Sequence, residues 1–505
     1  MSTHFLHFVD VSFSYDHASV PLFDGLGVSF DEGWTGIIGA NGTGKTTLLL
    51  LATGGLSPRD GTIRAPGSSL YCPQRTDDLP PFFHDFLEAR DASAGELRGR
   101  LGIEEQWAER WESLSHGERK RAQIAIALWK EPPVLAIDEP TNHIDAETRR
   151  LLLRGLEGYR GIGLLVSHDR ELLDRLCRRC LLIDPPRATL RPGGYTQASL
   201  LDTQEKRQRR ERYERARDQE RALQRKVAEK RREAEGSRRR LSKRTIDPRD
   251  RDAARRIDLA RLSSKDRTVA RQVSELEGRL DRASAAAASA SAAKEHDLGL
   301  WFRSERVRRD ILFSFPAADL PLGGDRVLAV PALVMYPRDR IALTGPNGCG
   351  KSTLLGHIVA QLMLPAGRLI YLPQEVSAEE SARIMVDLRE LKGTELGRAM
   401  TVVNLLGSDP DRILASVIPS PGEIRKVLIA VGIARVPHLI VMDEPTNHLD
   451  LPSIECLTAA LAACECGLLL VSHDTRFNSD LTATRWEIEG EGSGRNVMRV
   501  ASRAG

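Results

Sequence analysis

The chain has 505 residues, 41% hydrophobic and 28% charged, which suits a soluble globular protein of several domains and excludes a disordered chain. Its longest apolar runs fall far short of the roughly 20 residues that cross a bilayer, and its N-terminus lacks the charged-then-apolar pattern of a secretory signal. The seven cysteines, an odd number, indicate reduced thiols. Together these features predict a cytoplasmic protein without a transmembrane segment.

The first motif along the chain is a glycine-rich turn. An apolar strand over 34–38 leads into Gly39-x4-Gly44-Lys45-Thr46, which matches a phosphate-binding P-loop. Small residues let backbone N–H groups close around phosphates at a helix N-terminus, where the helix dipole also favours anions. We expect Lys45 to reach the β- and γ-phosphates and Thr46 to hold Mg²⁺. The nucleotide-binding residues predicted in this turn are Gly39, Asn41, Gly42, Gly44, Lys45, Thr46 and Thr47.

Four polar positions downstream complete the expected chemistry. Asp138 ends an apolar strand, as expected of a carboxylate in the magnesium shell, and Glu139 follows it, where a carboxylate can polarise the attacking water. His168 lies just past the next apolar strand, in position to contact the γ-phosphate or the water. The side-chain amide of Gln74 is placed to join the metal and the water. We therefore predict catalytic roles for Glu139 and His168 and a metal role for Thr46, Gln74 and Asp138.

The middle of the chain, residues 198–296, is poor in glycine and aromatic residues and has a helical composition. A heptad-like spacing is followed by Leu262, Val269, Val273, Leu276 and Leu280. Asp247 before a proline breaks the helical pattern. This predicts an antiparallel helical hairpin. Residues 204–282 carry about 12 more basic than acidic side chains, so we expect the basic part of the hairpin, 204–256, to contact a phosphate backbone. Scarce aromatic residues favour structured RNA over single strands read by stacking.

The second half of the chain repeats the motifs of the first at offsets of about 300 to 306 residues. The repeat predicts two α/β domains of largely parallel sheet, which we call the first cassette (1–197) and the second cassette (297–505). The second P-loop supplies nucleotide-binding candidates at Gly345, Asn347, Gly348, Gly350, Lys351, Ser352 and Thr353. The remaining counterparts are Gln374, Asp443, Glu444 and His473, with Ser352, Gln374 and Asp443 as the second magnesium set and Glu444 and His473 as the second catalytic pair.

The order P-loop, Gln, Ser-x-Gly-Glu, Asp-Glu and His, given twice, resembles the ATP-binding-cassette superfamily. The phrases "EPTNHID" and "EPTNHLD" are similar to the diagnostic element of its F subfamily, soluble tandem cassettes of which many work on the translating ribosome. The resemblance covers nearly the whole chain. It implies two P-loop ATPase cassettes joined by a helical hairpin, with ATP and Mg²⁺ as cofactors. It also implies a monomer whose two cassettes pair with each other.

The same resemblance assigns further residues. Two ATP molecules are expected head-to-tail between the cassettes, each touching the P-loop of one cassette and the Ser-x-Gly-Glu of the other. The Ser-x-Gly-Glu residues are Ser115, Gly117 and Glu118 in the first cassette and Ser420, Gly422 and Glu423 in the second. Asp145 and Asp450 are expected to line the seam between the cassettes. Tyr15 resembles the aromatic residue that stacks on adenine; Phe313 and Phe315 are weaker candidates for which core packing is an equal alternative.

These expectations converge on a ribosome-binding ATPase. Closure of the cassettes on ATP would set the hairpin against ribosomal RNA, in a translation factor or in a protein that protects ribosomes from antibiotics. Short spacers within the first cassette and after His473 leave no room for the extra arm or the C-terminal coiled coil of other members. Two alternatives remain: the ATP-binding subunit of a membrane transporter and, more remotely, a DNA-associated ATPase.

Two positions in the second cassette depart from the first. In "PSPGEIRK", Pro421 replaces His116 and removes an N–H group that could face phosphate. Because this loop is expected to face the first P-loop, we predict that the ATP site built on Lys45 is the slower of the two. Cys349 lies inside the second P-loop, where an electropositive pocket is expected to lower the pKa of its thiol.

Overall fold

The computed structural model describes residues 5–16, 21–142, 144–240, 265–289, 310–365, 367–416, 419–447, 449–490 and 495–502. The chain divides into two compact units. One unit consists of Met1–Ala198 with Leu298–Gly505, and the other of Ser199–Asp297. The division into three domains at 197 and 297 stays a prediction.

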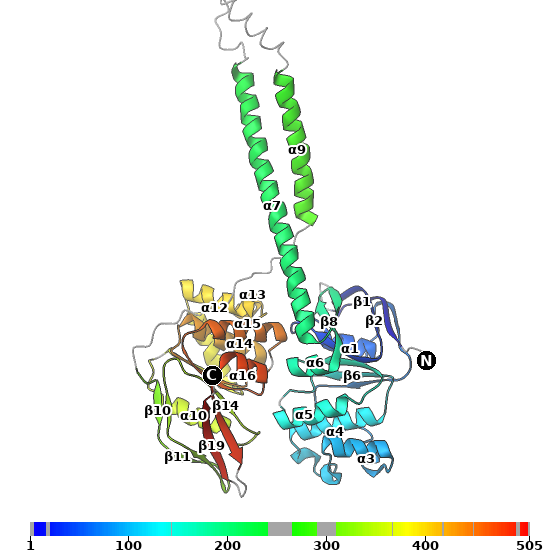
Figure 1. The fold of residues 1–505 in the computed structure, drawn as a ribbon, viewed down its shortest axis with the longest axis vertical. Helices are drawn as coiled ribbons and strands as arrows, with labels where there is room; N and C mark the ends of the chain where they lie inside the picture. Colours follow the sequence, from blue (N-terminus) through cyan, green and yellow to red (C-terminus); the bar gives the residue numbers. More distant parts are fainter. Residues whose placement is uncertain are drawn as a thin grey trace, which may run out of the picture. The chain divides into compact units, whose positions relative to one another are not determined.

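The first cassette is built on a six-stranded sheet in the order β5-β6-β7-β3-β8-β9, in which the first five strands of this order run parallel and β9 runs antiparallel to β8 (Figure 1). A second, antiparallel sheet has the order β2-β1-β4. The elements are β1 (Leu6–Phe13), β2 (Phe23–Phe30), β3 (Gly33–Ile38), α1 (Lys45–Ala52), β4 (Asp60–Arg64), β5 (Ser69–Cys72), α2 (Phe83–Glu88), α3 (Ala92–Leu101), the 3₁₀ helices η1 (Glu105–Trp107) and η2 (Trp111–Ser113), α4 (His116–Trp129), β6 (Val134–Asp138), α5 (Ala146–Leu156), β7 (Ile162–Val166), α6 (Arg170–Leu176), β8 (Cys177–Asp184) and β9 (Arg187–Pro192).

The second cassette has an eight-stranded sheet in the order β11-β12-β19-β18-β14-β17-β16-β15 and a two-stranded sheet of β10 and β13. Strands β18, β14, β17, β16 and β15 run parallel, as their counterparts do in the first cassette. The elements are β10 (Phe313–Phe315), β11 (Ala318–Gly323), β12 (Arg326–Val330), β13 (Leu333–Met335), β14 (Arg340–Thr344), α10 (Lys351–Gln361), β15 (Leu369–Leu372), α11 (Ala378–Glu390), α12 (Gly393–Leu405), α13 (Pro410–Ala415), α14 (Pro421–Ala434), β16 (Leu439–Asp443), α15 (Leu451–Ala463), β17 (Gly467–Val471), α16 (Thr475–Leu481), β18 (Thr484–Gly490) and β19 (Arg495–Ser502).

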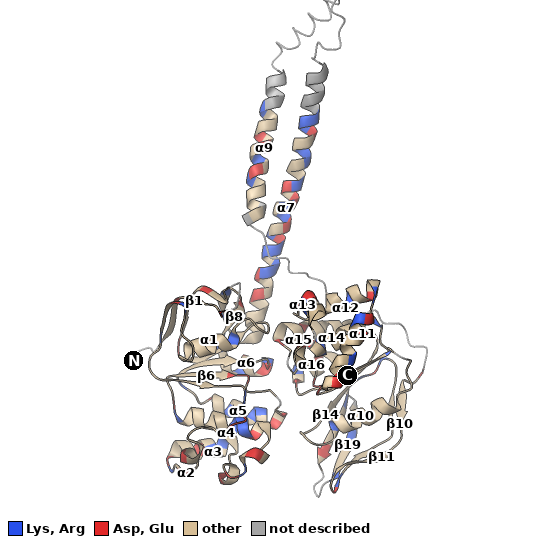
Figure 2. Cartoon of the chain, turned by 180° about the vertical axis from the view of Figure 1, so that it is seen from behind, with Lys and Arg blue, Asp and Glu red and all other residues tan. Residues whose placement is uncertain are grey.

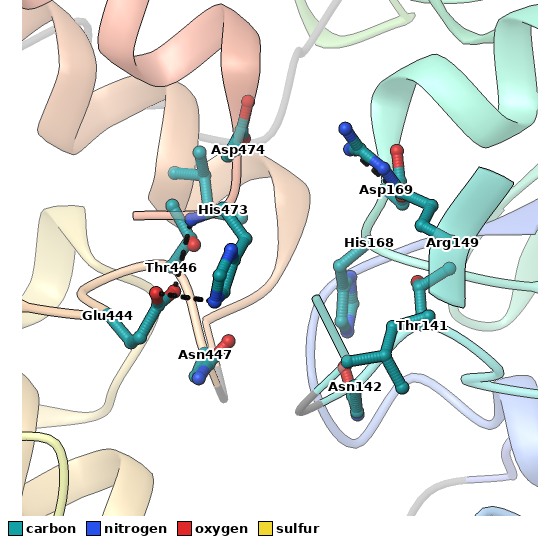
Figure 3. Close-up of a pocket in the computed structure, with 12 residues that line it drawn as sticks. Thr141, Asn142, Arg149, His168, Asp169, Glu444, Thr446, Asn447, His473 and Asp474 are labelled. Atoms are coloured by element: carbon teal, nitrogen blue, oxygen red, sulfur yellow. Dashed lines mark hydrogen bonds and ion pairs between the residues drawn. The ribbon is translucent and has the colours of Figure 1, made fainter. Parts of the chain in front are cut away.

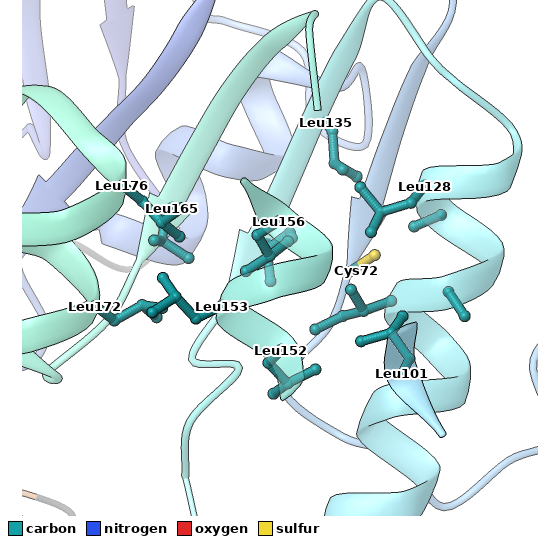
Figure 4. Packing of buried hydrophobic residues seen from close by; sticks show 14 of the residues in the cluster. Cys72, Leu101, Leu128, Leu135, Leu152, Leu153, Leu156, Leu165, Leu172 and Leu176 are labelled. Atoms are coloured by element: carbon teal, nitrogen blue, oxygen red, sulfur yellow. The ribbon is translucent and has the colours of Figure 1, made fainter. Parts of the chain in front are cut away.

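The central strands are buried on both faces. Every residue of β6, β7, β16 and β17 is buried, because helices cover one face and a P-loop helix with antiparallel strands covers the other. Figure 4 shows one such cluster, in which Leu128 and Leu152 of the helices pack near Leu135, Leu165 and Cys72. The α/β fold with two similar cassettes is confirmed. This packing leaves the carboxyl ends of the parallel strands for polar side chains.

The second unit contains α9 (Lys265–Ser289) and, from Ser199 on, the long helix α7 (Tyr195–Arg240). Apolar side chains make their contact: Leu223 and Val227 of α7 are buried, as is Ala283 of α9. Arg231 donates from Nε to Glu277 Oε1 at 2.9 Å, which joins the two helices by an ion pair. The predicted helical pair is thereby confirmed. The predicted break at 247–248 lies outside the described residues.

The seam predicted for the second helix of the pair agrees with its burial. Val273, Leu276 and Leu280 are half-buried, and most of their neighbours are exposed. The predicted seam positions Leu262 and Val269 lie outside the residues whose side chains are described. At 1.5 Å per residue, the 46 residues of α7 extend over roughly 70 Å. In the part of the chain that is described, no helix is both long and apolar enough to span a membrane.

Candidate functional site: two P-loop sites and the seam between them

Both P-loops have the geometry of a phosphate cradle. Helix α1 begins at Lys45 after Gly44, whose φ is 94°, and α10 begins at Lys351 after Gly350, whose φ is 103°. A Cβ atom at either glycine would lie 2.6 Å from a leucine side chain, so the turn requires glycine for space as well as for conformation. These turns present the N-termini of two helices, which favour anions.

The two P-loop lysines have the same contacts. Lys45 Nζ donates to the carbonyls of Gly39 and Ala40 at 2.9 and 3.0 Å. Lys351 Nζ donates to the carbonyls of Gly345 and Pro346, both at 2.9 Å. Both lysines are buried, and burial lowers the pKa of Lys45. Each ammonium group therefore lies folded over its own loop, and its hydrogen bonds within the described residues go to carbonyl oxygens that a triphosphate can replace.

The residues expected to hold magnesium lie together. Thr46 donates from its hydroxyl to Asp138 Oδ2 at 2.7 Å, and Ser352 hydrogen-bonds Asp443 in the second cassette. Among the described residues, the buried Asp443 Oδ2 atom has no hydrogen-bond partner. Mg²⁺ prefers oxygen donors of this kind: a hydroxyl, and a carboxylate with an unpartnered buried oxygen, both beside a phosphate cradle. The set therefore fits the ion.

Each strand-end glutamate is held against a histidine. Glu139 and Glu444 have φ values of 46° and 48°, a strained conformation for residues other than glycine, and such strain is typical of functional sites. The backbone N–H of His168 donates to Glu139 Oε2 at 3.2 Å, and His168 Nε2 lies 3.1 Å from Glu139 Oε1. The second cassette repeats this with His473 and Glu444, at 3.3 and 3.4 Å.

Burial sets the protonation of these pairs. It raises the pKa of Glu139 and of Glu444 to about 8, because the charged carboxylate loses its hydration. Burial, assisted by the nearby P-loop lysine, lowers the pKa of His168 to about 3 and that of His473 to about 4. Both imidazoles are therefore neutral at pH 7, while each glutamate is poised to exchange a proton.

A cavity of about 390 Å³ collects the predicted residues of the second site. Its lining joins the P-loop to Gln374, Asp443, Glu444 and His473, and Arg326 completes one wall. The side chains of Gln74 and Gln374 are exposed, and neither amide contacts Asp138 or Asp443 through a hydrogen bond in the described part of the chain. Both glutamines therefore follow the strands that lead to the sites, but no hydrogen bond within the described residues fixes their amides against the aspartates.

The adenine candidates differ in their surroundings. The Tyr15 ring is 51% exposed, and its hydroxyl lies 2.9 Å from the Thr47 hydroxyl at the start of α1. Phe315 is buried in the core of the second cassette, and Phe313 packs edge-on against Trp486. Core packing, the alternative left open for the two phenylalanines, therefore accounts for both.

The two Ser-x-Gly-Glu segments start helices of equal length, α4 and α14. Ser115 and Ser420 are the N-caps, and Glu118 and Glu423 complete a capping box with them in both helices. Pro421 occupies the first helical position, where a missing N–H does not weaken the helix. No hydrogen bond or ion pair joins Ser115 to Lys351 or Ser420 to Lys45 among the described residues. Their proposed contacts with nucleotide remain predictions.

The seam between the cassettes carries polar contacts of unequal kind. Asn41 of the first P-loop donates its N–H to Asp450 Oδ2 at 2.8 Å. Arg170, which is buried, pairs with Asp474 at 3.0 Å. A small cavity of about 70 Å³ lies at this seam. His168 and His473 line it from opposite sides (Figure 3). Asp450 thus contacts the opposite P-loop, and Asp145 lines a cavity with Pro346 and Lys351 of the second P-loop. Each aspartate also caps its own helix.

Three functional candidates were missed by sequence reasoning. The Tyr71 hydroxyl donates to Asp138 Oδ2 at 3.1 Å, and no hydrogen bond joins its counterpart Tyr371 to Asp443 in the described residues. Lys120 and Arg425 are buried cations whose donors reach the backbone of the two glutamine turns. The signal was present: both tyrosines stand three residues before the repeated glutamine, and both cations stand five residues after the repeated serine.

The expectation for Cys349 is wrong. The thiol is buried, and burial raises its pKa above the ordinary value despite the neighbouring Lys351. Loss of hydration around the thiolate outweighs the attraction of the ammonium group, so the neutral thiol is favoured.

Comparison with known proteins agrees with this geometry. The profile of the family described as "ABC transporter" matches residues 24–142 and 331–447. The chain is 26% identical over 515 residues to the ribosome protection protein VmlR of Bacillus subtilis, covering 97% of this chain and 88% of that protein. It is 29% identical over 525 residues to the tylosin resistance ATP-binding protein TlrC of Streptomyces fradiae, covering 91% and 93%.

A solved structure has the same fold. The archaeal ribosome recycling factor aABCE1, in complex with the stalk protein aP1, superposes with a TM-score of 0.61 at 18% identity, covering 97% of this chain and 89% of that one. Two matched P-loop cassettes therefore place both halves of the chain in the ATP-binding-cassette superfamily, and over nearly its whole length the chain is similar to resistance and ribosome protection proteins of the ABC-F type.

Proposed function

We propose that this protein is an ATPase that binds ribosomes, hydrolyses ATP to ADP and phosphate at two sites, and uses ATP-driven closure of its cassettes to set its helical hairpin against ribosomal RNA. The observation that carries the ATPase half is the duplicated constellation of P-loop lysine, hydroxyl–aspartate pair and glutamate–histidine pair. The full-length similarity to a ribosome protection protein supports the ribosomal half.

The chain's own residues divide the reaction among them. Mg²⁺, when bound, neutralises charge on the β- and γ-phosphates; the candidates to hold it are Thr46, Gln74 and Asp138, with Ser352, Gln374 and Asp443 in the second site. Lys45 turns from its loop carbonyls to the phosphates. Ionised Glu139 accepts a proton from the attacking water, as Glu444 does in the second site. The imidazole of His168 stays neutral, and the backbone N–H of His168 orients Glu139 by donating to Oε2.

The seam supplies the switch. In the proposed closed state each nucleotide touches Ser-x-Gly-Glu of the opposite cassette, so ATP favours the closed form by its better contacts there. Hydrolysis removes the γ-phosphate and with it that preference. Asp450 accepts a hydrogen bond from Asn41 of the first P-loop, so its contacts would change as the first site closes.

The hairpin supplies the proposed contact with RNA. Figure 2 shows basic and acidic residues along the ribbons of α7 and α9. Ion pairs at helical spacing, such as Arg210 with Glu214 and Arg271 with Glu275, neutralise part of the charge. Most of the predicted basic excess near the turn lies outside the residues whose side chains the structure describes. In the described part of α7 that precedes this segment, Arg225, Lys226 and Arg232 are exposed.

Sedimentation with ribosomes tests the proposal. The double variant Glu139→Gln with Glu444→Gln should keep ATP binding, lose turnover and pellet with ribosomes in ATP at low salt. Binding should weaken steeply as salt rises, because phosphate contacts release counterions. Charge reversal at Arg225, Lys226 and Arg232 should weaken binding at least about tenfold. The matched reversal at Arg207, Arg209 and Arg212, nearer the start of α7, should have less effect. A double variant that sediments free of ribosomes would reject the ribosomal half.

A further inference from the structure

Besides the P-loop lysines, each cassette buries a cation on the helix that follows Ser-x-Gly-Glu for which the described residues supply no carboxylate ion pair. Lys120 is 0% exposed and Arg425 is 3% exposed. Within the described residues neither forms an ion pair; the acceptors are backbone carbonyls and one side-chain amide. Burying a charge costs several kcal/mol unless strong contacts offset it. A duplicated, buried, unpaired cation is therefore unlike ordinary core packing.

The two cations occupy the same place in the fold. Each is the fifth residue of the helix that Ser-x-Gly-Glu begins, α4 or α14. Lys120 Nζ donates to Pro73 O at 2.7 Å and, at 3.4 Å, to Gln74 O. Arg425 Nη1 donates to Gln374 O at 2.9 Å. Each cation thus ties its helix to the turn that carries the glutamine expected to hold magnesium.

The two cassettes reach this link by different chemistry. In the first, Lys120 also donates to Gln123 Oε1 at 3.0 Å, and Gln123 donates to Arg75 O at 3.4 Å, so a lysine and an amide hold three successive carbonyls. In the second, the planar guanidinium of Arg425 reaches Asp443 O at 3.0 Å and Glu444 O at 2.8 Å with its other nitrogen. Among the described residues, the cation of the second cassette therefore also binds the backbone of the strand-end acids, and that of the first cassette does not.

We propose that Lys120 and Arg425 are positioning residues that lock the glutamine turn, and in the second cassette also the Asp443–Glu444 backbone, to the helix that starts at Ser-x-Gly-Glu. This inference rests on the proposed ATPase function. In each cassette, the cation couples the position of that helix to the position of the residues expected to hold magnesium. Because the helix start is expected to touch the nucleotide of the opposite cassette, the cation links one ATP site to the other.

Exchange of backbone amide hydrogens tests the lock without turnover. In the nucleotide-free full-length protein, Lys120→Met should speed exchange in the turn 72–76 at least about tenfold, and Lys120→Arg should restore it. Arg121→Met is the matched control, because Arg121 follows Lys120 on the same helix and donates instead to Leu101 O and Gly102 O. It should leave exchange in 72–76 within about twofold of wild type.

Turnover then tests the consequence. In the Glu444→Gln background, where only the Lys45 site hydrolyses, Lys120→Met should lower kcat about 10- to 100-fold, the usual effect of removing a residue that supports metal ligands. Binding of a fluorescent ATP analogue without Mg²⁺ should change less than about threefold, because the P-loop is untouched. Lys120→Arg should recover most of kcat.

The outcomes separate the two claims. Slow exchange and wild-type kcat in Lys120→Met overturn the inference and leave the proposed ATPase intact. A wild-type protein without ATPase activity overturns the proposed function, while the exchange comparison still decides the lock. If Lys120→Met does not fold, Arg425→Lys is tested in its place. This change keeps the charge but removes the planar guanidinium that binds several carbonyls at once. Amide exchange in 373–376 and at Asp443–Glu444 should therefore become faster. Unchanged exchange there also overturns the inference.

Discussion

The hydrogen bond from Tyr71 to Asp138 gives a quantitative test of the first magnesium site. Tyr71→Phe removes one hydroxyl and leaves the ring, so Asp138 Oδ2 keeps only its bond from Thr46. A hydrogen bond to a charged group contributes about 1.5–3 kcal/mol. Tyr71 is only half-buried, so we expect about 1–2 kcal/mol, equivalent to Mg²⁺ half-saturation that is about 5- to 30-fold weaker.

The assay is a Mg²⁺ titration of ATPase activity at saturating ATP in the Glu444→Gln background, which reports the Lys45 site alone. Tyr371→Phe in the Glu139→Gln background is the matched control. No hydrogen bond joins Tyr371 to Asp443 in the described residues. The Mg²⁺ concentration at half-saturation should therefore change less than about twofold in the Tyr371→Phe variant. Equal shifts in the two variants, or no shift in either, would refute the reasoning.

Two more outcomes follow from the site. If the Lys45 site is the slower one, Glu444→Gln should remove more of the total ATPase activity than Glu139→Gln; equal losses would count against unequal sites. Because burial raises the pKa of both glutamates to about 8 and the base must be ionised, kcat/KM should rise nearly tenfold per unit from pH 6 toward 8. A profile that is flat over this range would show carboxylates already ionised at pH 6.

Sequence periodicity and repetition were enough to predict the fold. The apolar runs before Asp138 and Asp443 became fully buried parallel strands, and the composition of 198–296 became two long helices. These features depend on local pattern, which is why a single sequence carries them. The position of the P-loop glycines was equally local, since their φ values follow from the turn itself.

Contacts between distant segments could not be predicted in the same way. Tyr71 lies 67 residues from Asp138, and Arg425 reaches carbonyls 51 residues upstream and 19 downstream. The error at Cys349 has a similar origin: the sequence shows a neighbouring lysine but not the burial that outweighs it. Phe315 likewise looked like a base-stacking candidate until its burial in the core was visible.

The asymmetry between the cassettes became clearer in three dimensions. Pro421 alone suggested a weakened half-site, yet α14 starts with the same capping box as α4. The larger differences lie elsewhere: Asn41 contacts Asp450 across the seam, and a lysine with a glutamine replaces the arginine fork below the glutamine turn. These differences are the better candidates for unequal turnover.

The central claim is that ATP-bound cassettes place the hairpin against ribosomal RNA. Its most direct test is an electron cryomicroscopy map of the Glu139→Gln, Glu444→Gln double variant with ATP and ribosomes. The account predicts density for two closed cassettes, each with nucleotide between P-loop and Ser-x-Gly-Glu, and the turn of the 198–296 hairpin in contact with RNA. A map in which the bound protein keeps its hairpin away from RNA would contradict it.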